Sequence, residues 1–422
     1  MTLYMHSFNG KLKKETKDMN QTTNINKIIL MNGVVAFLLF FIIIARFSAA
    51  YFSYAMIIAA LFFFMEVLNF RKIVPNLKMT NVYFLISYIS LYGCMFISQL
   101  INGDYAGIVI LLHWLVYSLS MWIIWYICGS YSNLRYCKMG ILLGTLLASA
   151  MAISQYVRNP DLLFLIKGTY GYHNTLGAMM MLAIPVLLGA FFEAKKFLLK
   201  ILYLSVIALA VVSIVISGSR GAMISLMVAL LLGTLIILIR TFHSGILRKG
   251  VKSIIVSFFV IVMCLIGVYQ TQSTKSGLSE IGGERIFMIQ SSLEMWNDHK
   301  LTGIGISNWE DNYYGEYHIN GSQEKGLTYD HNLLTYSLAT SGIIGTIGYL
   351  LSIISMIIGF YKTYKVSQNP MLILGLFVSF VAFVFHCQVN PDIQNNTIPR
   401  FYYALIGLAM AAYSLCSDNK ER

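Results

Sequence analysis

Three residues of this sequence combine side chains and settings suited to chemistry on a phosphorylated sugar. Arg220 lies in the motif SGSRGA, Arg285 follows the glycine pair of GGERIF, and His331 lies in YDHNLL. Guanidinium groups bind phosphates bidentately, and an imidazole with an ordinary pKa can remove a proton near neutral pH. If the three side chains converge, they supply an anion clamp and a general base.

Each of these residues also has a simpler interpretation. An arginine at a span end can be an anchor that reaches the headgroups. Arg285, expected at a helix start, can be compensated by Glu284, and His331 can be a solvated neighbour of the helix cap Asp330. The turn around Arg220 favours the phosphate role, because its glycines allow close backbone approach and its serines add hydroxyl donors. These residues are Ser217, Gly218, Ser219 and Gly221.

Further polar residues on the same predicted side are candidates for substrate binding. The segment GTYGYHNTLGA at 168–178 either caps the span that follows it or binds a sugar or lipid phosphate. Arg158 lies shortly before it, and Asn332 directly follows the histidine of YDHNLL. The expected substrate-binding residues are Arg158, His173, Asn174 and Asn332. The sequence has no DxD, HExxH, CxxC or GxxxxGK[ST] motif, so neither a metal nor a cofactor is expected.

The elements that position these residues are expected to be membrane helices. Of the 422 residues, 57% are hydrophobic and 11% are charged, whereas a soluble domain carries about 25% charge. Apolar runs of about 20 residues can cross a membrane as helices. Twelve spans are predicted, at 28–45, 48–70, 82–101, 107–128, 137–154, 174–192, 199–217, 221–239, 252–270, 342–361, 370–387 and 399–416.

The distribution of basic residues predicts the orientation of this all-α integral membrane protein. With a cytoplasmic N-terminus, 21 of the 30 Lys and Arg residues fall in the inner segments, as the positive-inside rule requires. The net charge of +12 therefore indicates membrane topology rather than nucleic-acid binding. The predicted parts are a cytoplasmic tail 1–27, spans over 28–270, a large periplasmic loop 271–341, spans over 342–416 and a cytoplasmic tail 417–422.

The long polar loop is expected to contain short helices. Apolar residues at helical spacing predict an amphipathic helix with one buried stripe. That stripe would consist of Ile286, Ile289, Leu293 and Trp296. The glycine pair before it is expected to break the chain, which would place Arg285 in the first turn. A second short helix is expected to begin near His331 and to be interrupted at Gly342 and Gly345.

Three motifs together resemble a known family. They are SGSRGA at 217–222, GGERIFMIQSSLEMWNDHKLTGIG at 282–305 and YDHNLLTYSLATSGIIGTIG at 329–348. In order, spacing and predicted outer location they are similar to the O-antigen ligase and polymerase superfamily of bacterial membrane glycosyltransferases. The resemblance covers about 170–350. It implies a glycosyltransferase of the C type (GT-C), with about a dozen helices and a large periplasmic loop over a lipid-accessible cavity.

The resemblance also implies the roles of the site residues. Arg220 and Arg285 would stabilise a leaving lipid pyrophosphate, and His331 would take the proton of the acceptor hydroxyl. The implied donor is a glycan on undecaprenyl pyrophosphate in the bacterial inner membrane, and the reaction takes place at its periplasmic face. The implied acceptor is the lipid A core sugar in ligases and another repeat unit in polymerases. A single displacement would invert the anomeric carbon without a metal.

Three functions are therefore weighed against one another. The O-antigen ligase of lipopolysaccharide biosynthesis is favoured, because polymerases often carry more spans or a second large loop. A repeat-unit polymerase that uses the same donor is the alternative within the class. A secondary transporter is the alternative from another class. Transporters usually place an ionisable residue near mid-membrane and show related halves, and the sequence predicts neither here.

Overall fold

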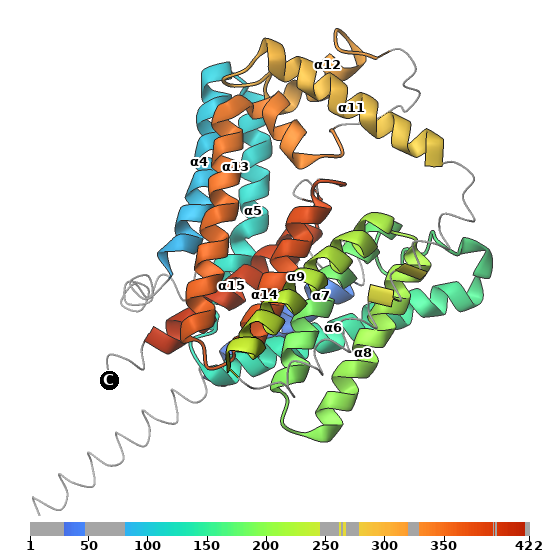
Figure 1. Cartoon of the computed structure of the whole chain (residues 1–422), viewed down its shortest axis with the longest axis vertical. Helices are drawn as coiled ribbons and strands as arrows, with labels where there is room; N and C mark the ends of the chain where they lie inside the picture. Colours follow the sequence, from blue (N-terminus) through green and yellow to red (C-terminus); the bar gives the residue numbers. More distant parts are fainter. Residues whose placement is uncertain are drawn as a thin grey trace, which may run out of the picture.

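The structure, a computed structural model, describes a chain whose regular elements are helical in all the ranges below (Figure 1). The residues described are 29–46, 81–244, 261–262, 265–266, 278–319, 329–390, 392 and 395–417. Seven of the described helices are long and apolar enough to cross a membrane. They are α4 (Val82–Asn102), α5 (Tyr105–Ile127), α6 (Tyr131–Arg158), α7 (His173–Glu193), α8 (Phe197–Ser217), α9 (Arg220–Ser244) and α13 (Leu333–Val366).

The predicted spans agree with this architecture wherever the chain is described. Ten of the twelve coincide with helices, including the shorter Ile29–Ala45, α14 (Pro370–His386) and α15 (Ile398–Ser417). The predicted span 48–70 and most of 252–270 lie outside the described residues. Several apolar helices of membrane length make the chain a multi-pass membrane protein.

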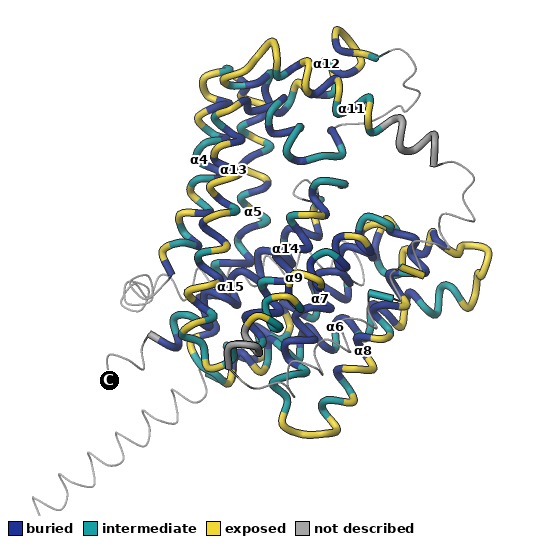
Figure 2. Tube along the Cα trace, in the orientation of Figure 1, coloured by how far each residue is buried: buried dark blue, intermediate teal, exposed yellow. Residues whose placement is uncertain are grey.

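The helices pack in two groups that α15 joins. In one group α13 runs along α4 beside α5, and in the other α14 runs along α7 beside α8 and α9 (Figure 1). Helix α15 packs along α5 and also contacts α6, α7, α13 and α14. Figure 2 shows that α7 is buried along nearly its whole length. The core therefore lies between the two groups, around α7, α14 and α15.

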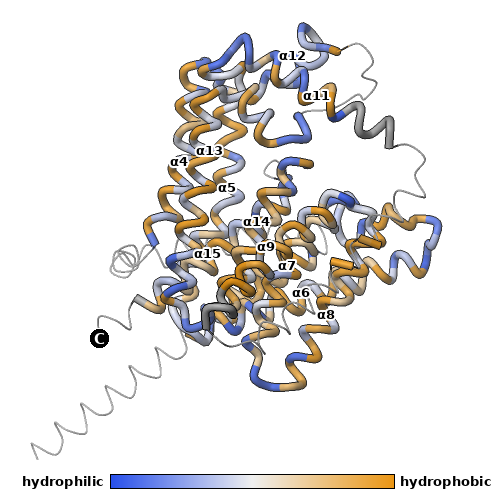
Figure 3. Tube along the Cα trace, in the orientation of Figure 1, coloured by the Kyte–Doolittle hydropathy of each residue, from blue (hydrophilic) through white to orange (hydrophobic). Residues whose placement is uncertain are grey.

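A layer of short helices covers one end of the first group. It consists of α11 (Leu278–Asp298), a 3₁₀ turn at Ile306–Asn308 and α12 (Trp309–Tyr314). Figure 3 shows hydrophilic segments gathered on this layer and on the loops, whereas the long helices are largely hydrophobic. The layer lies at the end of the molecule that the sequence predicts to be external.

Hydrogen bonds fix this layer to the connection between α4 and α5. Asp104 caps α5 through Gly107 N at 2.8 Å and also accepts from Ser307 N at 3.0 Å. Ser98 and Asn102 each donate to Thr302 O at 2.7 Å. Because charge-assisted bonds to a largely buried carboxylate are stronger than neutral ones, the layer is held in one position over the first group.

The predicted buried stripe of α11 is wrong. Ile286 is 55% exposed and Leu293 is 39% exposed. The face that packs inward consists of Met288, Ser291, Ser292 and Met295. Its serines are satisfied across the interface, since Ser291 Oγ donates to Tyr317 O at 2.7 Å and Ser292 Oγ accepts from Trp309 Nε1 at 3.0 Å. Small polar side chains fit this close contact, which hydrophobic spacing alone does not indicate.

The start of α11 also differs from the prediction. The helix begins at Leu278 and continues through Gly282 and Gly283. Arg285 therefore lies about two turns inside the helix rather than in its first turn. The argument that Arg285 opposes the helix dipole no longer applies.

The kink of α13 confirms the predicted break at Gly342. Its backbone has φ 59° and ψ −159°, which separates a short helix from the following span. A Cβ at this position would lie 2.4 Å from the backbone of Leu301, so only glycine fits the contact. Gly345, which was also expected to interrupt the helix, lies within its regular part.

Candidate active site

His331 lies directly before α13, in a turn that is fixed on both sides. Asn332 caps the helix, since its side-chain oxygen accepts from Leu334 N at 2.9 Å and from Thr335 N at 3.1 Å. The next backbone amide, Leu333 N, donates to Cys387 O at 2.9 Å and attaches the turn to the end of α14. Asn332, expected to bind substrate, therefore has its side-chain oxygen committed to the helix cap.

Asp330 connects this turn to α11. The residue is fully buried and accepts hydrogen bonds from Asn332 N at 3.0 Å and from the hydroxyl of Thr335. Ser292 on α11 also hydrogen-bonds the carboxyl group. Burial raises the pKa of Asp330 to about 6 despite these hydrogen bonds, which lower it. Asp330 thus holds the element that carries Arg285 against the turn that carries His331.

His331 and Arg285 are brought together by this arrangement. Burial, and after it the charge of Arg285, lowers the pKa of His331 to about 4. A hydrogen bond from its ring to the Asn390 side chain raises this pKa. The Tyr329 ring packs edge-on against the imidazole at 6.0 Å between centroids. The Nδ1 atom is buried and has no hydrogen-bond partner in the part of the chain that is described. The imidazole is therefore neutral at physiological pH and has one unused acceptor atom.

Three polar residues that were not predicted from the sequence form a network that supports His331. Asn390 Nδ2 donates to Asp392 Oδ1 at 2.9 Å, and Asp392 Oδ2 lies 2.5 Å from His386 Nδ1. Asn390 N also donates to His386 O at 2.8 Å. His386 and Asp392 are both buried. The signal that could have identified them is the polar run HCQVNPDIQNN between two predicted spans.

The Arg220 turn lies beside this polar network. Gly218 ends α8 with φ 68°, and a Cβ there would lie 2.6 Å from the backbone oxygen of Phe164. A Cβ on Gly221 would lie 3.4 Å from His386 Nε2. The Arg220 side chain is partly exposed and makes no hydrogen bond or ion pair with the described residues. It is therefore available to an anion.

The serines of this turn do not have the expected role. Ser217 and Ser219 are both buried. Ser217 Oγ donates to Ile214 O at 2.7 Å and accepts from Ser219 N at 3.3 Å. The Ser217 hydroxyl stabilises the turn internally, because a helix end with left-handed glycine leaves backbone groups that need partners.

The other predicted binding residues lie around the site at different levels. His173 Nδ1 lies 3.0 Å from Ser217 O, so this histidine supports the Arg220 turn. Asn174 is exposed. The segment 168–178 reaches the His331 turn, since Tyr172 is within electrostatic range of Tyr329. Arg158 is exposed in the last turn of α6, and no described contact joins it to His331.

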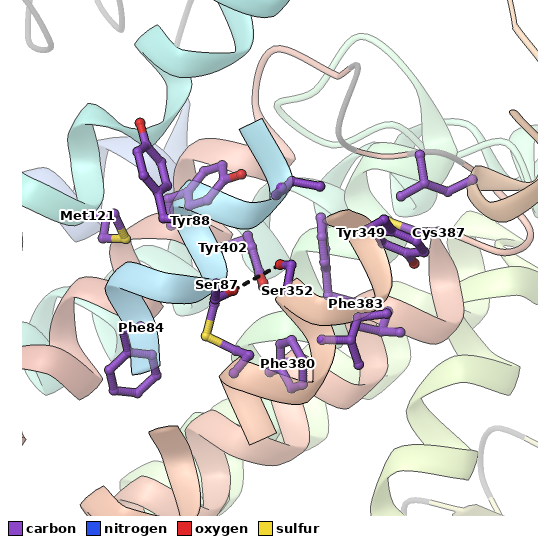
Figure 4. Close-up of a pocket in the computed structure, with 16 residues that line it drawn as sticks. Phe84, Ser87, Tyr88, Met121, Tyr349, Ser352, Phe380, Phe383, Cys387 and Tyr402 are labelled. Atoms are coloured by element: carbon purple, nitrogen blue, oxygen red, sulfur yellow. Dashed lines mark hydrogen bonds between the residues drawn. The ribbon is translucent and has the colours of Figure 1, made fainter. Parts of the chain in front are cut away.

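A cavity beneath the His331 turn is too small to be a substrate site. Its lining includes Leu333, Cys387 and the hydrogen-bonded pair Ser87 and Ser352, and Figure 4 shows Cys387 and this pair. The volume is about 40 Å³, whereas one water molecule occupies about 30 Å³ of the liquid. The cavity is part of the packed core.

The comparison with known families agrees with this geometry. A family model described as O-antigen ligase matches residues 204–350. The matched segment is similar to the O-antigen ligase family. The matched segment contains Arg220, Arg285 and His331, and the family supports a role as a membrane enzyme of the ligase and polymerase type that acts on lipid-linked glycans. No individual curated protein matches the sequence.

The family segment is completed by residues outside it. Asn390, Asp392 and His386 lie beyond residue 350, yet they support His331 and adjoin the Arg220 turn. The candidate site is therefore built from four separate stretches of chain. They are the α8–α9 turn, α11, the start of α13 and the α14–α15 connection.

Proposed function

We propose that the chain is an O-antigen ligase that transfers a polysaccharide from undecaprenyl pyrophosphate to the lipid A core sugar of lipopolysaccharide. The observation that supports this most is the convergence of a neutral His331 with Arg285, with the Arg220 turn beside the same polar network. A base and two cations on separate elements suit an attack by a hydroxyl and the departure of an anion. The family match gives the class of reaction, and the ligase activity is the finer proposal.

His331 is assigned as the general base. Its Nδ1 would accept the proton of the acceptor hydroxyl while that oxygen forms a bond to the anomeric carbon. The bond from the anomeric carbon to the pyrophosphate oxygen breaks at the same time, and its electron pair leaves with undecaprenyl pyrophosphate. One such displacement inverts the anomeric configuration. A buried acceptor atom without a partner costs free energy, about 1–3 kcal/mol, and a substrate hydroxyl would supply that partner.

Arg285 and Arg220 are assigned to the leaving pyrophosphate. Loss of one positioned donor to a developing anion costs about 3 kcal/mol in the transition state. A bound pyrophosphate would also neutralise the Arg285 charge that lowers the pKa of His331. The imidazole would then be a stronger base when donor is present than in the free protein. His173, Asn174 and Arg158 are proposed to contact the lipid or sugar around this centre.

The topology of a GT-C enzyme in the inner membrane is part of this proposal. It comprises about twelve spans, with 271–341 as a periplasmic loop and the termini 1–27 and 417–422 in the cytoplasm. Two features support it: the candidate site adjoins the α11 layer, and Lys362 and Lys365 lie near the opposite end of α13. Positive charge is enriched on the cytoplasmic side of membrane proteins.

The deciding experiment is transfer in vitro with the purified chain, a defined lipid-linked glycan and lipid A core. We expect product with an inverted anomeric carbon, made equally well in EDTA. His331→Gln, Arg285→Gln and Arg220→Gln should each reduce turnover by about 10²-fold or more. Activity abolished by EDTA would contradict the metal-independent mechanism.

The polymerase alternative is distinguished by changing the acceptor. A ligase uses lipid A core and leaves lipid-linked repeat units unjoined, whereas a polymerase joins two lipid-linked units. In cells, deletion should remove surface glycan while the lipid-linked polymer accumulates. Lipopolysaccharide capped by a single repeat unit would indicate a polymerase instead. Substrate uptake that survives the changes at His331 and Arg285, without any glycan transfer, would indicate a transporter.

A further inference from the structure

Two arginines outside the family segment form a second cationic cluster. Arg46 follows the helix Ile29–Ala45, and Arg400 lies in the first turn of α15. Their guanidinium groups are close enough to repel one another electrostatically. Arg46 Nη1 donates to Thr397 Oγ1 at 2.6 Å, and the Arg400 guanidinium lies over the Tyr117 ring at 4.9 Å. Two like charges that repel one another require a reason, because their repulsion opposes folding.

The cluster is recessed far below the outer helix ends. Tyr117 lies 12 residues along α5 from Tyr105, which is about 18 Å at 1.5 Å per residue. Ser120, one turn deeper, donates to Arg400 O at 2.7 Å. On the other side, Ile44 packs against Gly144, 14 residues before the end of α6, or about 21 Å. Ionisable residues at such depth are costly and are usually functional.

The neighbouring chain offers little negative charge to this cluster. Residues 47–65, which directly follow Arg46, contain no Asp or Glu. Asp392 is the one carboxylate in the sequence between 387 and 399. Its two oxygens are engaged by His386 and Asn390. The charge of Arg46 is thus met by a hydroxyl group, Thr397, rather than by a carboxylate among the described residues.

The backbone at Arg46 is also unusual. Its φ is 33°, a conformation that residues other than glycine rarely adopt. Such a conformation costs about 1–3 kcal/mol and persists where the surroundings enforce it. Here the Tyr170 hydroxyl donates to Ile44 O, directly before the strained residue, and Thr397 holds the guanidinium. The bond to Thr397 thus holds the guanidinium of the strained Arg46 beside the start of α15, which carries Arg400.

We propose that Arg46 and Arg400 form a second anion site, which binds a phosphate group carried by a lipid. Two guanidinium groups match the several oxygens of a phosphate or pyrophosphate, and a bound anion would replace their repulsion with attraction. The α14–α15 connection contacts both sites, since Asn390 hydrogen-bonds His331 and Thr397 accepts from Arg46. The phosphate belongs either to a lipid-linked pyrophosphate or to a phospholipid headgroup.

The test measures anion binding and does not depend on glycosyl transfer. The full chain in phosphatidylcholine nanodiscs is titrated with inorganic pyrophosphate by calorimetry. The variant Arg220→Gln/Arg285→Gln should retain one binding event. That event should weaken at least about tenfold when Arg46→Gln or Arg400→Gln is added. Arg135→Gln, an exposed residue near the other end of α6, is the matched control and should change nothing.

A second arm identifies the source of the phosphate. Nanodiscs that contain phosphatidylglycerol are examined by native mass spectrometry for retained lipid. Retention that falls in Arg46→Gln/Arg400→Gln identifies a headgroup, whereas loss of pyrophosphate binding alone identifies the lipid-linked pyrophosphate. Both results support the site. Equal pyrophosphate binding and equal lipid retention in wild type and variant overturn it.

Thermal unfolding separates binding from a structural role. Without an anion, Arg400→Gln should leave the melting temperature unchanged or raise it, because repulsion with Arg46 is removed. In the Arg220→Gln/Arg285→Gln background, pyrophosphate should raise the melting temperature of the protein that keeps Arg400 but not that of the protein with Arg400→Gln. Arg46→Lys/Arg400→Lys keeps the charge and should recover part of the binding. A large destabilisation by Arg400→Gln together with unchanged pyrophosphate binding would show a structural role and refute the site.

Discussion

Asn390 hydrogen-bonds the ring of His331, and the Nδ1 atom of that ring has no partner among the described residues. Because this hydrogen bond raises the pKa of His331, the Asn390 amide oxygen accepts it from the imidazole, while Nδ2 donates to Asp392. An N–H donated to Asn390 leaves the lone pair on the other ring nitrogen. Asn390 is thus a positioning residue that selects the protonation state of the ring.

Substitution of Asn390 is expected to affect catalysis through His331. Asn390→Ala should lower turnover about tenfold, since one hydrogen bond that orients the ring is lost. The Asn390 bond raises the pKa of His331, so its loss moves the acid limb of the kcat/KM profile to lower pH. Asn390→Asp should move the limb to higher pH. If the acid limbs of the Asn390→Ala and Asn390→Asp profiles do not shift in opposite directions, Asn390 has only a structural role.

Substitution of Arg285 is expected to make His331 easier to protonate. The Arg285 charge lowers the pKa of the imidazole, second only to burial. The neutral base is lost as the pH falls through about 4 in the free protein. Arg285→Gln should therefore move the acid limb of kcat/KM to higher pH, and should reduce kcat by about 10²–10³-fold. An unchanged limb would mean that the two side chains do not interact.

Asp330 and His331 are expected to change stability with pH in opposite directions. The pKa of Asp330 rises from 3.8 to about 6 on folding, so its contribution to the stability of the protein is lost as the pH rises across that interval. The pKa of His331 falls from 6.5 to about 4, so its contribution is present above pH 6.5 and is lost as the pH falls. In Asp330→Asn only the contribution of His331 to this pH dependence is left. Melting temperatures between pH 6.5 and 4 should fall more steeply than in the wild type, whereas Asp311→Asn at an exposed site should follow the wild type.

The kink at Gly342 is expected to tolerate no side chain. Alanine there would meet the Leu301 backbone at 2.4 Å in a backbone conformation with positive φ. Gly342→Ala should lower the free energy of unfolding by about 2 kcal/mol or more. It should also expose the α11 layer to hydrogen exchange. Gly93→Ala is the matched control, because no atom lies within 4 Å of a Cβ at that position in α4. Equal stability of the two variants would contradict the assigned contact.

Much of the fold follows from composition and spacing. Runs of about 20 apolar residues predict helices wherever the chain is described, because a backbone inside a membrane must satisfy its own hydrogen bonds. The break at Gly342 was predictable from the glycine itself. The buried face of α11 was not, since Ser291 and Ser292 face inward to reach partners on other elements. Hydrophobic periodicity cannot indicate a polar interface that depends on tertiary contacts.

The candidate site was predictable only in part, for a related reason. Motifs identify Arg220, Arg285 and His331, because each lies in a short polar stretch between apolar runs. Asn390 and His386 lie in a stretch without a motif, and their relevance depends on a fold that brings the α14–α15 connection under His331. The substrate-binding assignments stay predictions, apart from the structural role that Asn332 has as a helix cap.

The contact between His331 and the α14–α15 connection also determines when the site is complete during synthesis. The three motif residues leave the ribosome before α14 and α15 exist. The imidazole gains its Asn390 neighbour only after α14 and the connection that follows it have been made. A shorter chain therefore holds the cations but not a correctly oriented base.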